Sequence, residues 1–241
     1  MYLSALLVDT GINPDRPRPG RLWMRQPYRI HQRLCMGFPL AEAKAGDPDF
    51  VRPYRVGAFS GVHQKIRTSE QAFLFRVDPL VNGRAMIVVQ SARRPDWEYA
   101  FRNADYLLAG PPEVKEVHHD YQEGQSLLFR LRANPTRRNN ETRKREGVLT
   151  EEKQREWLVR KGQSGGFEVL STTVTDESFK RATRKHLEEN EDSECMSHLS
   201  VRYDGILRVT GPEALREAII GGIGSAKAFG FGLLSVAPDR G

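Results

Sequence analysis

The stretch Ser126-Leu-Leu-Phe-Arg-Leu-Arg132 alternates between apolar and polar side chains. Successive side chains of a strand point in opposite directions, so Leu127, Phe129 and Leu131 share one face and the two arginines share the other. Such a strand packs one face on a core and leaves the other polar, as antiparallel sheets do. The stretch therefore predicts an antiparallel sheet in the second half of the chain.

The segments that follow this strand complete a β-α-β-β-α-β order. The expected elements are a helix capped by Thr150, a strand at Phe167–Leu170, a hairpin of Leu199–Tyr203 with Ile206–Val209 across Asp204-Gly205, a helix opened by the capping-box spacing Thr210-Gly-Pro-Glu213, and a strand at Leu233–Val236. This order favours an antiparallel sheet with both helices on one face, the ferredoxin-like arrangement.

The first half of the chain repeats the order. Its expected elements are strands at Tyr2–Val8, Ala72–Val77, Arg84–Ser91 and Val114–His119 and helices at Pro27–Cys35 and Asp96–Leu108, with a proline-rich loop at Asn13–Gly20 and a long insertion at Gly46–Ser69. Pro111-Pro112 and the polar residues up to Gly124 form the linker. The sequence thus predicts an α+β protein of two tandem ferredoxin-like (RRM/RAMP-like) domains, residues 1–115 and 122–241.

The composition favours a nucleic-acid partner. The 241 residues carry a net charge of +6, and of the 37 basic residues nine are lysines, which leaves 28 arginines. Arginine grips phosphate with two parallel hydrogen bonds, although a GC-rich genome would give the same bias. No apolar run approaches the ~20 residues of a membrane span, no secretory signal is visible, and Cys35 and Cys195 fit reduced thiols. We expect a cytoplasmic protein with no membrane partner.

The helix Pro27–Cys35 holds the first candidate site. At 100° per residue Tyr28 and His31 share one face, while Ile30 and Leu34 form a neighbouring apolar stripe. The helix can therefore bury the stripe and present a phenol and an imidazole together. Histidine exchanges protons near neutral pH. A half-buried histidine without a catalytic role is the alternative that the residues leave open.

A glycine-rich segment between the last helix and strand is the second candidate. Its distinctive residues are Gly222, Gly224, Lys227, Gly230 and Gly232. It is not a P-loop, because alanines flank the lysine and the element order is helix-loop-strand. Backbone N–H groups of such a loop can approach an anion closely, with the lysine adding charge. A tight connection without function is equally compatible with the pattern.

Basic residues of the second half form the third candidate. Arg130, Arg132, Asn134 and Arg138, continued by the basic residues 143–145, would follow a phosphate backbone. A second basic cluster, at positions 180, 181, 184 and 185, precedes an acidic run at Glu188–Glu194, which is typical of solvated surface.

Together these segments resemble the CasE-type CRISPR repeat endoribonucleases, the RNA-processing subunits of the type I-E Cascade complex. The resemblance rests on the N-terminal MYLS, on Tyr28-x-x-His31, on Phe129-Arg-Leu-Arg-Ala-Asn-Pro135 and on Gly224-Ser-Ala-Lys227-x-x-Gly230-x-Gly232-Leu-Leu-Ser-Val-Ala-Pro238. It implies the same tandem fold, with CRISPR repeat stem-loop RNA and other Cascade subunits as partners.

The resemblance also implies a reaction. The family cleaves the repeat transcript at the 3′ base of a stem-loop without a metal, by attack of the ribose 2′-OH, which leaves a 2′,3′-cyclic phosphate and a 5′-OH. By carry-over His31 is the principal catalytic residue and Tyr28 its assistant, while the glycine-rich loop, Lys227 and the basic strand hold RNA. No cofactor is expected. The alternative is a non-catalytic RNA-hairpin-binding subunit on the same fold; a small-molecule enzyme lacks any cofactor fingerprint.

Overall fold

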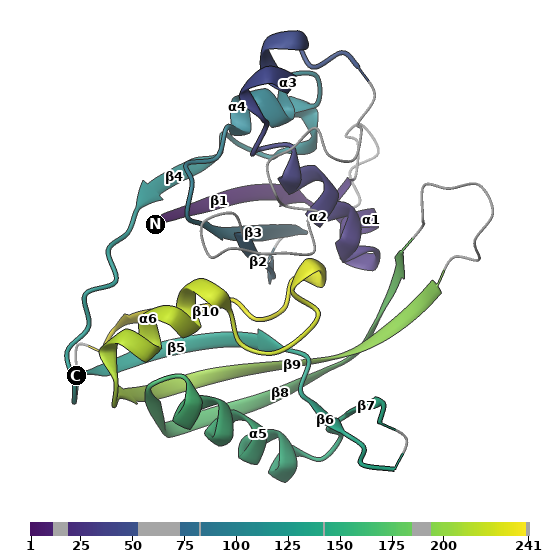
Figure 1. Cartoon of the computed structure of the whole chain (residues 1–241). Coiled ribbons are helices and arrows are strands. Elements are labelled where there is room, and N and C mark those ends of the chain that lie inside the picture. Colours follow the sequence, from purple (N-terminus) through teal and green to yellow (C-terminus); the bar gives the residue numbers. More distant parts are fainter. Residues whose placement is uncertain (12–18, 53–72, 82, 142, 185–193, 240–241) are drawn as a thin grey trace. The chain divides into compact units, whose positions relative to one another are not determined.

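The structure is a computed structural model that describes residues 1–11, 19–52, 73–81, 83–141, 143–184 and 194–239, without the side chains of 19, 178–184 and 194–197. The chain divides into two compact units, residues 1–117 and 118–241. This boundary lies between residues 115 and 122, the ends predicted for the two domains. Figure 1 labels the helices and strands of both units.

The first unit contains four strands and a set of short helices. In chain order they are β1 (Tyr2–Asp9), α1 (Pro19–Arg25), α2 (Pro27–Cys35), α3 (Ala41–Gly46), β2 (Phe73–Leu80), β3 (Arg84–Ser91), α4 (Trp97–Phe101), the 3₁₀ turn η1 (Asp105–Leu107) and β4 (Glu113–Glu116). The strands pair antiparallel in the order β2-β3-β1-β4.

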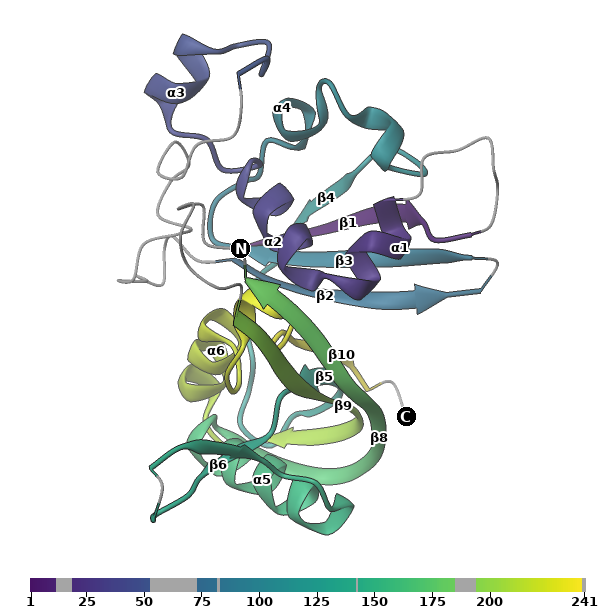
Figure 2. The ribbon, with the colours of Figure 1, turned by 90° about the vertical axis from the view of Figure 1, so that its right-hand side faces the viewer.

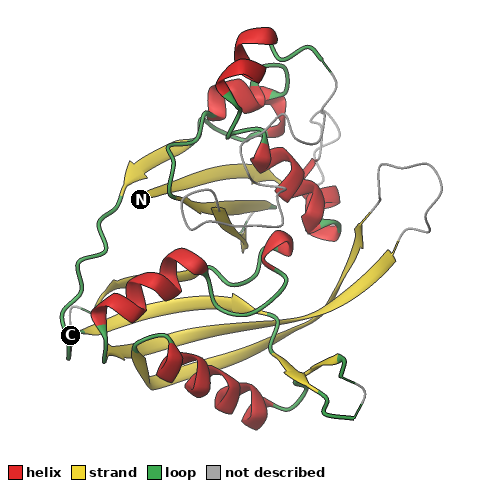
Figure 3. Ribbon diagram, in the orientation of Figure 1, coloured by secondary structure: helices red, strands yellow, loops and turns green. Residues whose placement is uncertain are grey.

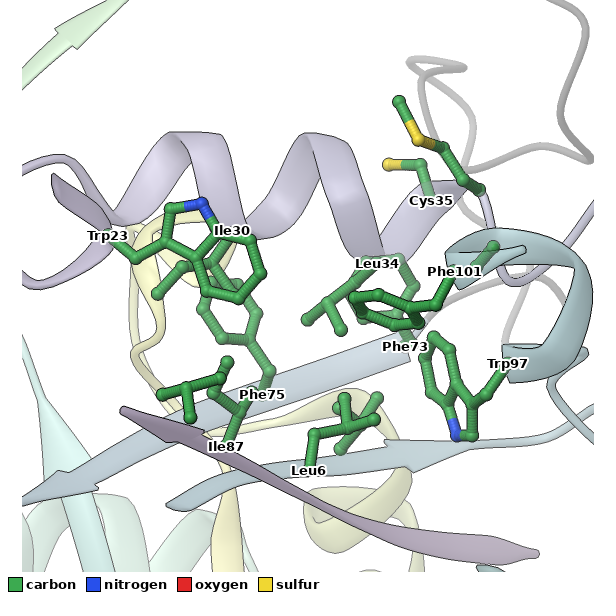
Figure 4. Packing of buried hydrophobic residues seen from close by; sticks show 14 of the residues in the cluster. Leu6, Trp23, Ile30, Leu34, Cys35, Phe73, Phe75, Ile87, Trp97 and Phe101 are labelled. Carbon is green, nitrogen blue, oxygen red and sulfur yellow. The ribbon is translucent and has the colours of Figure 1, made fainter. Parts of the chain in front are cut away.

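Helix α2 is held on this sheet by its apolar stripe. Ile30 and Leu34 are each 1% exposed, and burial of such a side chain contributes roughly 1.5–3 kcal/mol. Figure 4 shows α2 above the strands, with the rings of α4 at its C-terminal end. The labelled residues of this cluster are Leu6, Trp23, Ile30, Leu34, Cys35, Phe73, Phe75, Ile87, Trp97 and Phe101. The predicted apolar stripe of this helix is confirmed.

The second unit is also a four-stranded sheet with helices, and it carries an added hairpin. Its elements are β5 (Ser126–Ala133), β6 (Thr136–Arg138), β7 (Arg145–Gly147), α5 (Glu151–Ser164), β8 (Phe167–Arg184), β9 (Glu194–Val209), α6 (Pro212–Gly221), the 3₁₀ turn η2 (Lys227–Phe229) and β10 (Leu234–Pro238). The sheet order is β10-β5-β9-β8, and β6 pairs with β7. In Figure 2 the long strands β8 and β9 curve strongly.

The core of the second unit lies between the sheet and both helices. Trp157 and Leu158 of α5 and Leu215 and Ile219 of α6 belong to one buried cluster with the inward-facing side chains of β5. The predicted inner face of β5, Leu127, Phe129 and Leu131, is at most 5% exposed. The two helices therefore cover one face of the sheet, and the other face carries the polar side chains of β5.

The two units share one topology. With strands numbered in order within each unit, both sheets read 2-3-1-4 from one edge and every described pair of strands is antiparallel. Figure 3 shows helices and strands mixed in each unit. The α+β fold class with two ferredoxin-like units is confirmed.

The hairpin predicted at Asp204-Gly205 is wrong, because β9 continues through both residues. Gly205 pairs with Phe129 of β5 and with Thr172 of β8. A Cβ atom at this position would lie 2.0 Å from the carbonyl oxygen of Ser171, beside a shift in the β8 register. The glycine therefore permits a close backbone approach at a bulge rather than a turn.

Two predicted helix caps differ from the structure. Thr150 occupies the N-cap position of α5, but its side chain accepts no hydrogen bond there. The capping box at Thr210–Glu213 is wrong, since α6 has Gly211 as its N-cap and begins at Pro212. Proline suits the first helical position because its φ is already helical and it lacks an N–H. The N–H groups of Thr210 and Gly211 instead donate to the carbonyl of Gly166.

Several other boundaries move. The helix predicted at Asp96–Leu108 splits into α4 and η1, the strand predicted at Val114–His119 is β4, and the strand predicted at Phe167–Leu170 extends to Arg184. Helices α1 and α3 were not predicted. Most of the Gly46–Ser69 insertion and of the acidic run, and Lys185, lie outside the described residues. No helix of the described chain is long and apolar enough to cross a membrane.

Candidate active site

The start of α2 positions the first pair of candidate side chains. Pro27 occupies the first turn, and Gln26 precedes it as an N-cap whose side chain does not cap the helix. The Gln26 side chain instead accepts a hydrogen bond from Nε of Arg29 at 2.5 Å. Tyr28 and His31, one turn apart, then lie on one side of the helix, with ring centroids 5.6 Å apart.

His31 is more covered than the helical pattern predicts. Its ring lies 5.2 Å from the ring of Phe73 and 6.3 Å from that of Phe75, both on β2. The residue is 6% exposed, whereas Tyr28 is half-buried. The expectation of an imidazole presented beside the phenol is therefore corrected: the two rings do lie together, but aromatic side chains of the sheet cover the imidazole.

Arg33, on the same helix, contacts α4. Nη1 of Arg33 donates to the carbonyl oxygen of Ala100 at 3.0 Å, and the guanidinium lies over the ring of Phe101. Burial lowers the pKa of Arg33, and the electrostatic interaction with Tyr106 opposes part of this shift. Arg33 thus joins α2 to α4.

On β5, the predicted RNA-binding arginines face carboxylates of the same sheet. Nε of Arg130 lies 2.5 Å from Oδ1 of Asp204. Arg132 donates two hydrogen bonds to Glu177, Nε to Oε2 at 2.7 Å and Nη2 to Oε1 at 2.8 Å. Ser200 and Arg202 complete this network. We call these six residues the polar sheet face.

Sequence reasoning missed Glu177, which a bulge brings onto this face. Asp176 pairs with Val201 and Phe179 with Leu199, so the register shifts between them. Glu177 accepts hydrogen bonds from Arg132 and from the hydroxyl of Ser200 at 2.8 Å. Local spacing gives no sign that the two side chains meet, because Arg132 and Glu177 are 45 positions apart.

The hairpin β6–β7 carries the exposed part of the basic region. Arg138 is exposed, as are the four other basic residues of the hairpin, Arg137, Arg143, Lys144 and Arg145. Glu146 lies 3.7 Å from Arg137, and Glu141 is the other acidic residue of the hairpin. The hairpin therefore offers an excess of positive charge to a polyanion, unlike the polar sheet face.

Residues 222–232 form a closed loop whose backbone requires glycine. Gly222, Gly224, Gly230 and Gly232 all have φ between 74° and 90°, and Ala226 has a φ of 61°. The loop is joined at its base by the hydrogen bond from Ile223 N to Gly232 O, at 2.8 Å. Gly232 N also donates to the carbonyl of Arg132 at 2.8 Å. The ammonium of Lys227 donates to the carbonyl oxygen of Gly221 at the end of α6.

The structure thus brings the predicted residues together in two groups. Tyr28 and His31 meet in the first unit. In the second, Asn134 and the backbone of Arg132 contact the glycine-rich loop, and the side chains of Arg130 and Arg132 lie on the polar sheet face. Asn134, just after β5, contacts the loop through Ser225. Arg138 stands apart on its hairpin. In the described part of the chain, no group of three or more His, Cys, Asp or Glu side chains could hold a metal ion.

Comparisons with known proteins agree along the whole chain. The model of a family described as CRISPR associated protein matches residues 1–238. The CRISPR-associated endoribonuclease Cse3 of Thermus thermophilus is 31% identical over 205 residues, which cover 81% of this chain and 95% of that protein. The CRISPR system Cascade subunit CasE of Escherichia coli K12 is 26% identical, with 99% and 100% covered.

A solved structure agrees with the fold as well. Thermus thermophilus Cse3 bound to an RNA representing a pre-cleavage complex superposes with a TM-score of 0.68 at 27% identity, and the match covers 98% of each chain.

Proposed function

Because the chain belongs to the family of CRISPR-associated proteins, we propose that it is a CasE-type endoribonuclease that processes CRISPR repeat transcripts. The observation that carries this proposal is the full-length likeness to an endoribonuclease whose structure holds a pre-cleavage RNA. The substrate is a repeat stem-loop, cut at the 3′ base of its stem.

In the proposed reaction the RNA supplies its own nucleophile. The 2′-OH of the scissile ribose loses its proton to an acceptor as its oxygen attacks the adjacent phosphorus. The P–O5′ bond breaks, and a donor delivers a proton to the leaving 5′ oxygen. The products are a 2′,3′-cyclic phosphate and a 5′-OH, and no water is consumed. This chemistry needs a proton acceptor, a proton donor and positive charge near the phosphorane.

His31 and Tyr28 are the proposed catalytic residues. A neutral imidazole can accept the proton of the 2′-OH, and an imidazolium can deliver one to the 5′ oxygen. Tyr28, with its ring 5.6 Å from that of His31, positions the imidazole or passes the proton. Since Phe73 and Phe75 cover the ring, we propose that a ribose reaches it from the side of the half-buried Tyr28.

The second unit is the proposed RNA-binding part of the chain. The exposed arginines of the β6–β7 hairpin, Arg138 among them, would neutralise phosphates of the stem. A-form stems are read mainly through shape and phosphate, because their bases lie in a deep, narrow major groove. The glycine-rich loop with Lys227, supported by Arg130, Arg132 and Asn134, would bind phosphates nearer the cut. One relative is a Cascade subunit, so we propose that this chain also keeps its product in a Cascade complex, in the cytoplasm where the transcript is made.

A specific observation favours a second function, a non-catalytic subunit that only binds the hairpin: His31 is 6% exposed and packs on two phenylalanines. In that case the imidazole fills the core beneath α2 and touches no RNA. The two functions differ in one observable, the appearance of new RNA ends.

The test uses a 5′-labelled hairpin of the repeat from the same genome. The full chain should cut it once, equally well in EDTA, and leave a 2′,3′-cyclic phosphate on the upstream product. A matched hairpin with hydrogen in place of the scissile 2′-OH should bind equally and remain intact. Cleavage of that deoxy hairpin, or cleavage only with added magnesium, contradicts the mechanism; binding without cleavage of either hairpin selects the second function.

A further inference from the structure

His198 of β9 lies beside the glycine-rich loop. Its ring is 4.6 Å from the ring of Phe229, in the loop, and 6.1 Å from that of Phe231. Asn134, at the end of β5, is 6% exposed and lies 3.3 Å from His198 through Nδ2 and Nδ1. The histidine therefore contacts both the loop and the residue that follows β5.

The hydrogen bond fixes the state of the imidazole. An amide Nδ2 is a donor only, so Nδ1 of His198 must accept and the ring proton must lie on Nε2. Nε2 is buried and has no hydrogen-bond partner in the described part of the chain. Burial also lowers the pKa of His198, so the ring is neutral near pH 7. A protonated ring would lose the acceptor that Asn134 needs.

Asn134 extends the contact into the loop. Its Nδ2 also lies 3.4 Å from the hydroxyl of Ser225, and that hydroxyl lies 3.5 Å from the carbonyl oxygen of Asn134. Ser225 and Phe229 stand on either side of Ala226, the non-glycine residue with a left-handed φ of 61°. A strained conformation of this kind persists only where its surroundings fix it.

We propose that His198 is a positioning residue for the glycine-rich loop: through Asn134 and Phe229 it holds residues 222–232 in the conformation that binds RNA. The loop needs such support because its four glycines have many other conformations open to them and Ala226 holds a left-handed φ that is strained for alanine. The RNA part of this inference rests on the proposed function, whereas the ordering of the loop does not.

The experiment therefore has two arms, both on the full chain. The first measures, without RNA, hydrogen exchange of the Ile223 amide, which closes the loop, and of the Gly232 amide, which joins the loop to β5. We expect His198→Ala to accelerate their exchange about tenfold, the effect of losing roughly one hydrogen bond with its packing. His198→Asn, which keeps an acceptor near the place of Nδ1, should recover part of the protection, and His198→Phe, which keeps only the ring, should recover less.

The second arm measures binding and single-turnover cleavage of the repeat hairpin. His198→Ala should raise Kd about tenfold while the rate at saturating protein stays within about threefold. Tyr203→Phe is the matched control: it removes a hydrogen bond of the same strand, from Tyr203 to the carbonyl of Gln154 at 3.2 Å, and should leave loop exchange and Kd unchanged.

Unchanged loop exchange in all folded His198 variants overturns the inference, and so does faster exchange with an unchanged Kd. If His198→Ala does not fold, the Asn and Phe variants decide. If the wild type binds no hairpin, the proposed function fails, and the exchange arm still decides whether His198 orders the loop.

Discussion

Helix α2 of the first unit and strand β5 of the second both carry polar side chains of the candidate sites, but the surroundings of these side chains differ. The imidazole of His31 lies beside the aromatic rings of Tyr28, Phe73 and Phe75. The guanidinium groups of Arg130 and Arg132 have the carboxylates of Asp204 and Glu177. One region places an imidazole among aromatic side chains; the other is held together by ion pairs between guanidinium and carboxylate groups.

Because of this difference, we propose different roles for the two units. The polar sheet face holds three guanidinium groups against two carboxylates, so it offers little free charge to RNA. The β6–β7 hairpin instead exposes five basic side chains. We expect chemistry to depend on the first unit, RNA affinity on the hairpin and loop, and stability on the polar sheet face.

The largest expected effect comes from removing the imidazole of the first region. His31→Ala should slow single-turnover cleavage by about 10²–10⁴-fold, the usual range for acid–base help, and leave hairpin affinity within about twofold. His118→Ala, the same change at an exposed histidine, is the control and should cut normally. If His31→Ala cuts at the wild-type rate, the imidazole belongs to the core alone.

The next largest effect comes from removing a carboxylate of the second region. Arg132 and Glu177 have side chains only 10% and 14% exposed, so Glu177→Ala leaves a buried guanidinium without its main partner. We expect a loss of about 3 kcal/mol in the stability of the second unit, measured by hydrogen exchange of β5 and β9 amides.

The control for that variant is Glu151→Ala, which removes an exposed ion pair with Arg155 and should cost under about 1 kcal/mol. Equal losses in the two variants would mean that the polar sheet face is no more than solvated surface.

A smaller effect concerns pH in the second unit. Burial lowers the pKa of His198 below its ordinary 6.5, so folding favours the neutral ring. The associated stability is present above pH 6.5 and is lost as pH falls through the lower, folded pKa. Unfolding free energies at about pH 7.5, 6.5 and 5.5 should fall less steeply for His198→Phe than for the wild type. His119, whose pKa burial also lowers, remains in both proteins; identical slopes would refute this assignment.

The smallest effect comes from removing one exposed positive charge of the β6–β7 hairpin. Arg138→Ala should weaken hairpin binding and reduce the slope of log Kd against log salt by about 1, the share of one phosphate contact. Arg160→Ala removes the same charge from the exposed face of α5 and should leave the slope nearly unchanged. Equal slopes for both variants would place the RNA elsewhere.

Local patterns predicted the strands and the α2 helix well, because alternation and helical spacing are properties of neighbouring residues. β3 and the inner face of β5 are examples, at Arg84–Ser91 and at Leu127, Phe129 and Leu131. The hairpin prediction at Asp204-Gly205 is wrong because this dipeptide, typical of turns, also occurs where a strand with a bulged neighbour needs a glycine. Only the position of the β8 backbone shows that the residues lie in a strand and not in a turn.

The sequence predicted which candidate residues lie together better than it predicted what surrounds them. Tyr28 and His31 do meet, as their spacing requires, but the cover from Phe73 and Phe75 comes from a strand more than 40 positions away. The partners of Arg132 and Asn134, Glu177 and His198, are equally remote in sequence. Long-range pairing of this kind follows from sheet register, which composition and spacing do not specify.

The most direct test of the division between the two regions measures Kd and single-turnover rate on one repeat hairpin for His31→Ala and Arg138→Ala side by side. The account predicts that His31→Ala lowers the rate and keeps Kd, while Arg138→Ala raises Kd and keeps the rate at saturating protein. Two variants that change the same quantity, in either direction, would contradict it.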